Sequence, residues 1–124
     1  MDILTIILQI VLALMFLFAG LGKIFGSKVH IDGFNRWRLP QWFRVVTGLI
    51  ELVGGAALIV GFWEESWIAA GSLVLGIVAI GGVLTHIRAK DSFKQTFPIL
   101  LFGILAVVLF CIHYSELSNF PGFK

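Results

Sequence analysis

The sequence has few charges, one cysteine and three prolines, and the first two shortages exclude whole classes of protein. Only 13% of the 124 residues are charged and 59% are hydrophobic, which gives a mean hydropathy of +1.02. A soluble domain of this length has too high a surface-to-volume ratio to bury so many apolar side chains. With Cys111 alone, an intramolecular disulfide and a cysteine-based metal cluster are both excluded. No glycine-rich phosphate-binding motif is present, and we expect neither a metal site nor a nucleic-acid partner.

What the chain does have is four long apolar segments, at about residues 3–25, 42–62, 66–87 and 97–114. Each approaches the ~20 residues that a helix needs to cross ~30 Å of hydrocarbon. Helices also satisfy their own backbone polar groups, which lipid cannot do. The sequence therefore predicts an all-α membrane protein, a single domain of residues 1–124 folded as an up-and-down bundle of four transmembrane helices. Pro98 is expected in the first turn of the last helix.

The connections between these segments differ in character. The first, residues 26–41, mixes basic and aromatic side chains, a composition that suits the boundary between water and lipid. It predicts a short interfacial helix between the first two spans. The second connection, residues 63–65, is short and acidic, and the third, residues 88–96, is basic again.

The basic residues predict the orientation in the membrane. Five of the nine flank the first connection and three flank the third, leaving only Lys124 on the opposite side. The positive-inside rule then places both basic connections in the cytoplasm and both termini outside. We expect the location to be the cell (inner) membrane of a bacterium. The eight residues on the cytoplasmic side are Lys23, Lys28, Arg36, Arg38, Arg44, Arg88, Lys90 and Lys94.

Glu51 is the one charge in the stretch TGLIELVGGAALIVG, residues 47–61. It lies nine residues in from Trp42, which is ~13 Å along a helix and close to the middle of the bilayer. A charge there costs about 2.5–3.5 kcal/mol on insertion scales. Two interpretations stay open: a protonated Glu51 that hydrogen-bonds a neighbouring helix, or a functional carboxylate in a wet or occupied pocket.

Small residues surround this carboxylate in the sequence. Gly48 and Gly55 share its helical face and Gly54 lies beside it. Such residues allow helices to approach closely, or leave room for water or a ligand head group. Gly22 and Gly26 form a second small pair near the end of the first span.

Three other polar residues are candidate partners of Glu51. Lys23 and His86 end the first and third spans on the same side of the membrane, and Arg44 lies two turns before Glu51 on its own helix. Lys23 could instead extend to the lipid head groups, and His86 could be an ordinary interfacial histidine. Ideal helices leave an axial gap of about 10 Å between Lys23 and Glu51, of which a lysine stem and a water could bridge part.

Together these residues predict a polar vestibule that opens to the cytoplasmic side. Glu51 lies deepest, Lys23, Arg44 and His86 lie nearer the mouth, and Arg36, Trp37 and Arg38 form a lid. A histidine facing a buried carboxylate would also be a candidate proton relay.

Three motifs resemble the DoxX-like family. They are FLFAGLGKIFG at residues 16–26, LPQWFRVVTGLIELVGGAALIVGF at residues 39–62 and VLTHIRAKD at residues 83–91. The resemblance implies a four-helix membrane protein with the family's matching positions at Lys23, Pro40, Glu51, Gly54, Gly55 and His86. Members are described as subunits of thiosulfate:quinone oxidoreductase or of other membrane redox complexes, and distant eukaryotic relatives as membrane chaperones.

Three functions are compatible with this sequence. The first is an accessory subunit of a quinone-linked redox or stress-related system, which binds a quinone or lipid in the vestibule. The second is a non-catalytic factor that assembles a membrane-protein partner. The third is proton-coupled transport of a small solute, which would require a homo-oligomer because four helices are few for alternating access. Since the chain shows no haem-ligand pair, flavin motif or cysteine pair, whether it is an enzyme stays open.

Overall fold

The computed structural model describes residues 3–121, whose regular structure is entirely helical. The order is α1 (Ile3–Phe25), α2 (Lys28–Arg36), α3 (Gln41–Val60), α4 (Ser66–Arg88) and α5 (Phe93–His113), followed by a short 3₁₀ helix η1 (Tyr114–Asn119). Four helices are long and apolar enough to cross a membrane. The prediction of an all-α fold with four spans and a short helix after the first is confirmed. Lys124, the one basic residue assigned to the outside, lies beyond the described residues.

The helix bounds follow the predicted segments closely except at the start of α5. This helix begins at Phe93, four residues before the predicted start. The earlier start has a local cause: the Ser92 hydroxyl accepts from the Gln95 N–H, and the Gln95 side chain accepts from the Ser92 N–H. The placement of Pro98 in the first turn is therefore wrong, since it is the sixth residue of α5.

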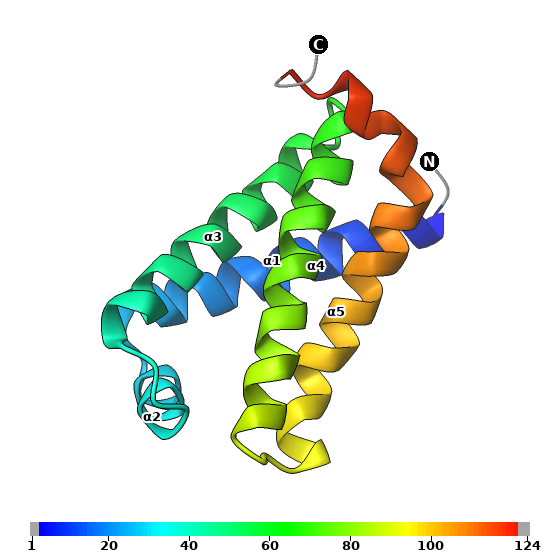
Figure 1. Ribbon diagram of the computed structural model, residues 1–124. Helices are drawn as coiled ribbons and strands as arrows, with labels where there is room; N and C mark the ends of the chain where they lie inside the picture. Colours follow the sequence, from blue (N-terminus) through cyan, green and yellow to red (C-terminus); the bar gives the residue numbers. More distant parts are fainter. Residues whose placement is uncertain (1–2, 122–124) are drawn as a thin grey trace.

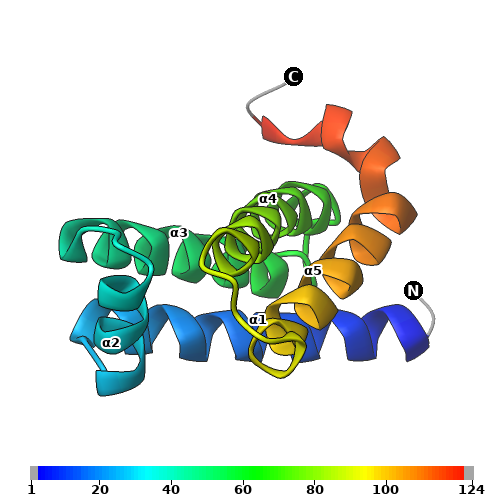
Figure 2. The same ribbon diagram turned by 60° about the horizontal axis from the view of Figure 1, so that its bottom comes forward.

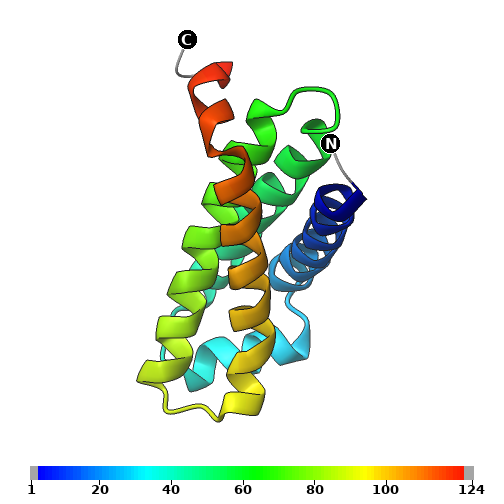
Figure 3. The same ribbon diagram turned by 90° about the vertical axis from the view of Figure 1, so that its right-hand side faces the viewer.

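The long helices form two pairs, α1 with α3 and α4 with α5. Figure 2 shows α1 and α3 side by side over most of their length, and Figure 3 shows the same for α4 and α5. Toward the end that carries α2 and the α4–α5 connection, the two pairs diverge (Figure 1). We call this the basic end, because it holds the two basic connections.

Glycines set how closely the helices approach. A Cβ on Gly48 would lie 2.8 Å from the carbonyl oxygen of Gly20, so α1 and α3 contact each other through their backbones there. On the opposite face of α3, a Cβ on Gly71 would lie 2.9 Å from the carbonyl oxygen of Gly54. Gly55 faces Leu17 of α1 at a similarly short distance. The predicted close-packing positions on α3 thus have specific contacts.

Each of the four long helices contributes large apolar side chains to the interior. A continuous core includes Leu12, Phe16, Leu58, Ile68, Leu75 and Leu109. Many equally large side chains face outward, among them Phe18 of α1 and Ile77 of α4, which are 79% and 61% exposed. Outward-facing apolar side chains of this number suit a hydrocarbon solvent, and the protein is a multi-pass membrane protein.

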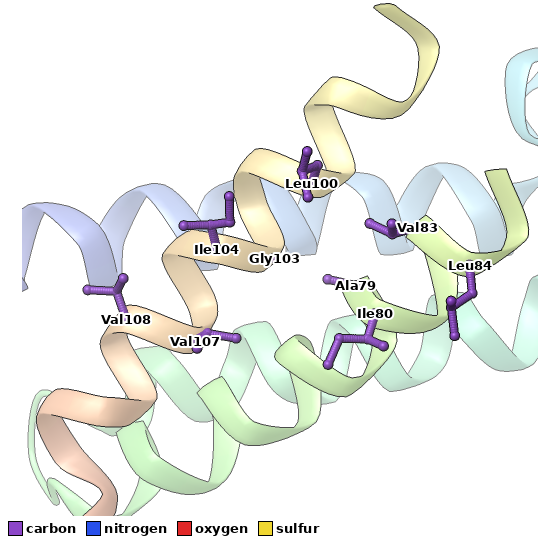
Figure 4. A pocket seen from close by; sticks show the side chains of 9 residues that line it. All are labelled: Ala79, Ile80, Val83, Leu84, Leu100, Gly103, Ile104, Val107 and Val108. Carbon is purple, nitrogen blue, oxygen red and sulfur yellow. The ribbon is translucent and has the colours of Figure 1, made fainter. Parts of the chain in front are cut away.

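Between α4 and α5 lies a shallow groove of about 320 Å³ whose lining is aliphatic throughout (Figure 4). Ile80, Leu84, Ile104 and Val108 form its exposed rim. We call it the α4–α5 groove. With no polar side chain in its lining, it suits hydrocarbon and offers no group for chemistry.

Candidate functional site

A cavity of about 830 Å³ occupies the space between the diverging helix pairs at the basic end. All five α-helices contribute to its lining, and most of the lining is aliphatic or aromatic. A small polar set interrupts these walls: Lys23, His30, Arg36, Trp37, Thr47, Glu51, Thr85, His86 and Gln95. An apolar cavity with a few convergent polar groups is the usual form of a small-molecule site.

Lys23 and Glu51 form an ion pair in this cavity. Nζ of Lys23 lies 2.8 Å from Oε1 of Glu51, and the two side chains are 15% and 2% exposed. The predicted axial gap is therefore absent. The reason is the close approach at Gly48, because a Cβ there would lie 2.9 Å from the Cβ of Lys23. The backbone of Lys23 therefore lies beside Gly48, and the lysine side chain needs to extend only along the single helical turn from Gly48 to Glu51.

The pair makes each of its charges tolerable in the interior. Either group alone would be an uncompensated charge in a low-dielectric environment. Together they present one ammonium and one carboxylate to the same apolar cavity. That arrangement supplies a donor and an acceptor side by side, without net charge.

Arg44 does not line the cavity, contrary to the predicted vestibule. Its guanidinium donates to the backbone carbonyl of Lys23 through Nη1 and to Oε1 of Gln41 through Nε. A cation at the carbonyl end of a helix is favourably placed against the helix dipole. Arg44 therefore holds the end of α1 against the start of α3, and so fixes the backbone that carries Lys23.

Gly22 and Gly26 also differ in role from the predicted helix-packing pair. A Cβ on Gly22 would lie 3.0 Å from the His30 ring, so this glycine makes room for α2 and not for another span. Gly26 has a φ of +73°, a backbone conformation that glycine adopts without strain, and it turns the chain from α1 into α2.

His30 comes from α2 and lines the cavity opposite Gly22. Burial lowers the pKa of His30 below its ordinary value of 6.5, and the nearby charges of Lys23 and Arg44 lower it further. The neutral ring is therefore favoured in the folded protein. Sequence reasoning did not identify His30, although its place in the basic connection was visible.

Asp91, in the connection between α4 and α5, joins three side chains at one oxygen. Its Oδ2 lies 3.1 Å from Nη2 of Arg36, 3.0 Å from Nε1 of Trp37 and 2.6 Å from Nδ1 of His86. The hydrogen bond from Trp37 makes the largest contribution to lowering the pKa of Asp91, with Arg36 and His86 adding to it. We call these four residues the Asp91 cluster.

The backbone places Asp91 beside His86. Lys90 has a φ of +59°, and the N–H of Asp91 donates to the carbonyl of His86 at 2.9 Å, which is the Schellman arrangement at the end of α4. The same motif ends α2, where Arg38 has a φ of +60°. Arg38 is exposed and absent from the cavity lining, so of the predicted lid residues only Arg36 and Trp37 reach the cavity.

His86 therefore has a different partner from the predicted one. Its ring contacts Asp91 and lies edge-on to Trp37, with ring centroids 5.0 Å apart. It lines the mouth of the cavity but makes no ion pair with Glu51.

Among residues 3–121, no three His, Cys, Asp or Glu side chains are grouped so that they could hold a metal ion.

Comparison with known proteins assigns the family. The family model described as "DoxX-like family" matches residues 7–109. The "Uncharacterized protein YdgD" of Bacillus subtilis (strain 168) is 26% identical over 113 residues, which cover 90% of this chain and 98% of that protein. No solved structure matches. Because the family model spans both halves of the bundle, including Lys23, Glu51 and the Asp91 cluster, the chain belongs to the DoxX-like family.

Proposed function

We propose that the protein binds an amphipathic molecule with an uncharged polar head, a quinone or a neutral lipid, in the cavity at the basic end. In this role it serves as an accessory subunit of a membrane redox or stress-related system. The observation that carries the proposal is the Lys23–Glu51 ion pair, which is buried in the wall of an otherwise largely apolar cavity.

The size and lining of the cavity support a ligand of this kind. About 830 Å³ falls within the ~300–1,000 Å³ typical of small-molecule sites. Phe16, Ile99 and Phe102 offer surfaces for a ring or hydrocarbon chain. The paired ammonium and carboxylate offer a donor and an acceptor for a carbonyl or hydroxyl group.

The charges at the site favour an uncharged head group. Lys23 is balanced by Glu51, and Arg36 at the mouth is balanced by Asp91. The neutral form of His30 is favoured. A charged head group would enter without a free counter-charge in this lining, and burying an unpaired charge is costly.

Ligands would reach this cavity from the bilayer. Its lining includes Phe18 and Ile77, which belong to membrane-spanning helices and are 79% and 61% exposed. They belong to α1 and α4, one helix of each pair, and we infer that the cavity is open to lipid between the two pairs. An amphipathic molecule could therefore enter sideways without crossing water.

The test is extraction of the bound molecule. Protein purified in mild detergent is extracted with organic solvent, and quinones and neutral lipids are quantified by mass spectrometry. We expect stoichiometric ligand with the unaltered protein, and about ten-fold less with Glu51→Gln or Lys23→Met, a loss of ~1.4 kcal/mol. Glu64→Gln, at an exposed carboxylate in the α3–α4 connection, is the matched control and should retain the ligand.

Two outcomes would overturn the proposal. One is an unaltered protein that retains neither quinone nor neutral lipid. The other is full retention by well-folded Glu51→Gln and Lys23→Met variants, with monodisperse elution in size exclusion showing that they fold.

A second function is favoured by the α4–α5 groove: assembly of a membrane-protein partner. A transmembrane helix can rest in an aliphatic groove by van der Waals packing. A photo-crosslinking residue in place of Ile104 should capture one stoichiometric partner, whereas one in place of Val53, exposed on α3, should not. Equal capture at both positions would remove this alternative.

Proton-coupled transport loses its supporting observation, because His86 contacts Asp91 and not Glu51.

A further inference from the structure

The Asp91 cluster crosses the gap between the two helix pairs. Arg36 and Trp37 belong to the end of α2, which is joined to α1 and α3 by short connections. His86 lies in the last turn of α4, and Asp91 follows the end of that helix. The contacts at Oδ2 of Asp91 therefore tie the α1–α3 half to the α4–α5 half at the basic end, where the two halves otherwise diverge.

Trp37 is the part of this cluster that covers the cavity. Its ring lines the cavity and lies edge-on to His86 on one side and to Phe34 on the other, with centroid distances of 5.0 and 5.3 Å. Arg88 of α4 donates to its backbone carbonyl as well. Displacing Trp37 would remove both the ring over the cavity and the α2–α4 contacts.

Little else holds α2 across the gap. Among the described hydrogen bonds and ion pairs, those joining α2 or Trp37 to α4 or to the α4–α5 connection are the contacts of Asp91 and Arg88. Phe34, buried, and Gln41, which donates to the carbonyl of Ile31, fasten α2 to the α1–α3 half instead. Loss of the Asp91 contacts would thus leave the end of α2 held across the gap only by the Arg88 hydrogen bond and the ring contact between Trp37 and His86.

We propose that α2 is a lid over the aqueous end of the cavity and that Asp91 is the latch that keeps it closed. With the latch formed, the cavity exchanges with the bilayer and excludes water from the basic end. With the latch released, Trp37 moves away and the cavity opens to water. This inference rests on the proposed function in treating the cavity as the binding site, and it names how access to that site is controlled.

The experiment measures water access with a cysteine in the cavity. Cys111→Ser removes the native thiol, and Thr47→Cys places a new one in the cavity lining, one turn from Glu51. The protein is placed in lipid nanodiscs, which expose both faces, and reacts with a charged, membrane-impermeant maleimide. No ligand is needed, so the result is independent of what the cavity binds.

We expect D91N to accelerate labelling of Thr47→Cys at least about ten-fold. Asparagine keeps the size of the side chain but loses the charge that Arg36 and His86 contact, which raises the open population. D32N, at an exposed aspartate on α2, is the matched control and should leave the rate unchanged. Ser27→Cys, exposed in the α1–α2 connection, should react quickly in every background.

Equal labelling rates for the D91N and D32N proteins would overturn the latch. If D91N does not fold, Trp37→Phe replaces it, since phenylalanine keeps an aromatic ring but cannot donate to Asp91. That variant should also label faster, and an unchanged rate would equally overturn the latch. A ligand-free extract combined with fast labelling of D91N would refute the proposed function and leave the latch standing.

Discussion

The ammonium group of Lys23 lies 2.8 Å from a carboxylate oxygen of Glu51, one helical turn from the point where Gly20 and Gly48 bring α1 and α3 into backbone contact. The glycines and the ion pair depend on one another. Without the close approach the lysine would not reach Glu51, and without the lysine the carboxylate would be unpaired at membrane depth.

Removing one partner of this ion pair should lower the stability of the protein more than removing both partners. We expect Lys23→Met or Glu51→Leu alone to destabilise the protein by about 3–5 kcal/mol, because the remaining charge is buried and uncompensated. The double variant should recover much of that loss. Thermal unfolding in detergent, read as a double-mutant cycle, gives the comparison. Additive effects of the two substitutions would contradict an energetically coupled pair.

Replacing Gly48 even by alanine should lower the stability of the protein. A methyl group there would meet the Gly20 carbonyl oxygen at 2.8 Å and Cβ of Lys23 at 2.9 Å, forcing α1 and α3 apart. We expect Gly48→Ala to lower stability by about 1–3 kcal/mol. Gly76→Ala is the matched control, because its added methyl group would have its nearest neighbour at an ordinary 3.8 Å. Equal melting temperatures for the two variants would rule out the tight crossing.

Acidification should weaken the folded state through His30. Its pKa is lowered in the fold, so between that value and 6.5 the unfolded chain binds a proton that the folded protein does not. Stability therefore falls as the pH drops through this window and is fully present above it. Melting temperatures from about pH 7.5 to about pH 5 should fall more steeply for the unaltered protein than for His30→Gln. Parallel profiles would show that His30 is not the group responsible.

Lys90→Gly should stabilise the protein. Lys90 has a φ of +59°, which costs a residue with a Cβ about 1–2 kcal/mol relative to its preferred conformations and costs glycine little. Thermal unfolding should move upward for this variant. Lys94→Gly, which removes the same charge at the second residue of α5, where the backbone is helical, should bring no such gain. A lower melting temperature for Lys90→Gly would argue against the Schellman ending that places Asp91.

The orientation with basic connections in the cytoplasm stays a prediction with a direct test. In a Cys111→Ser background, an impermeant thiol reagent applied to intact cells should label Ser115→Cys, in η1, and leave Ser27→Cys unlabelled until the cells are opened. The reverse pattern would place the termini in the cytoplasm.

The membrane spans were predictable because nearly every residue within them is apolar or small. Long apolar runs bounded by charged or aromatic residues leave few alternatives, and α1 begins and ends at the expected residues. The glycines around Glu51 were also readable as sites of close approach. The start of α5 was missed because the Ser92–Gln95 capping box was read as part of a polar connection.

The partners of each polar residue were far less predictable. The Lys23–Glu51 contact depends on which residues face each other where two helices cross, and ideal helices starting at one plane place them too far apart. Arg44 and His86 were assigned to Glu51 because all are polar and near the same membrane face, yet each has a nearer partner. Asp91 was overlooked because a single aspartate after a helix carries no motif.

Under the proposed function, the opening of the cavity toward lipid determines which concentration sets its occupancy. A molecule that arrives from the bilayer is diluted by lipid and not by water, so occupancy follows its mole fraction in the membrane. Adding empty lipid or detergent at constant total ligand should therefore strip the cavity, whereas enlarging the aqueous volume should leave it filled. For the same reason, a lipid-dissolved ligand could pass to a neighbouring membrane protein without ever becoming soluble.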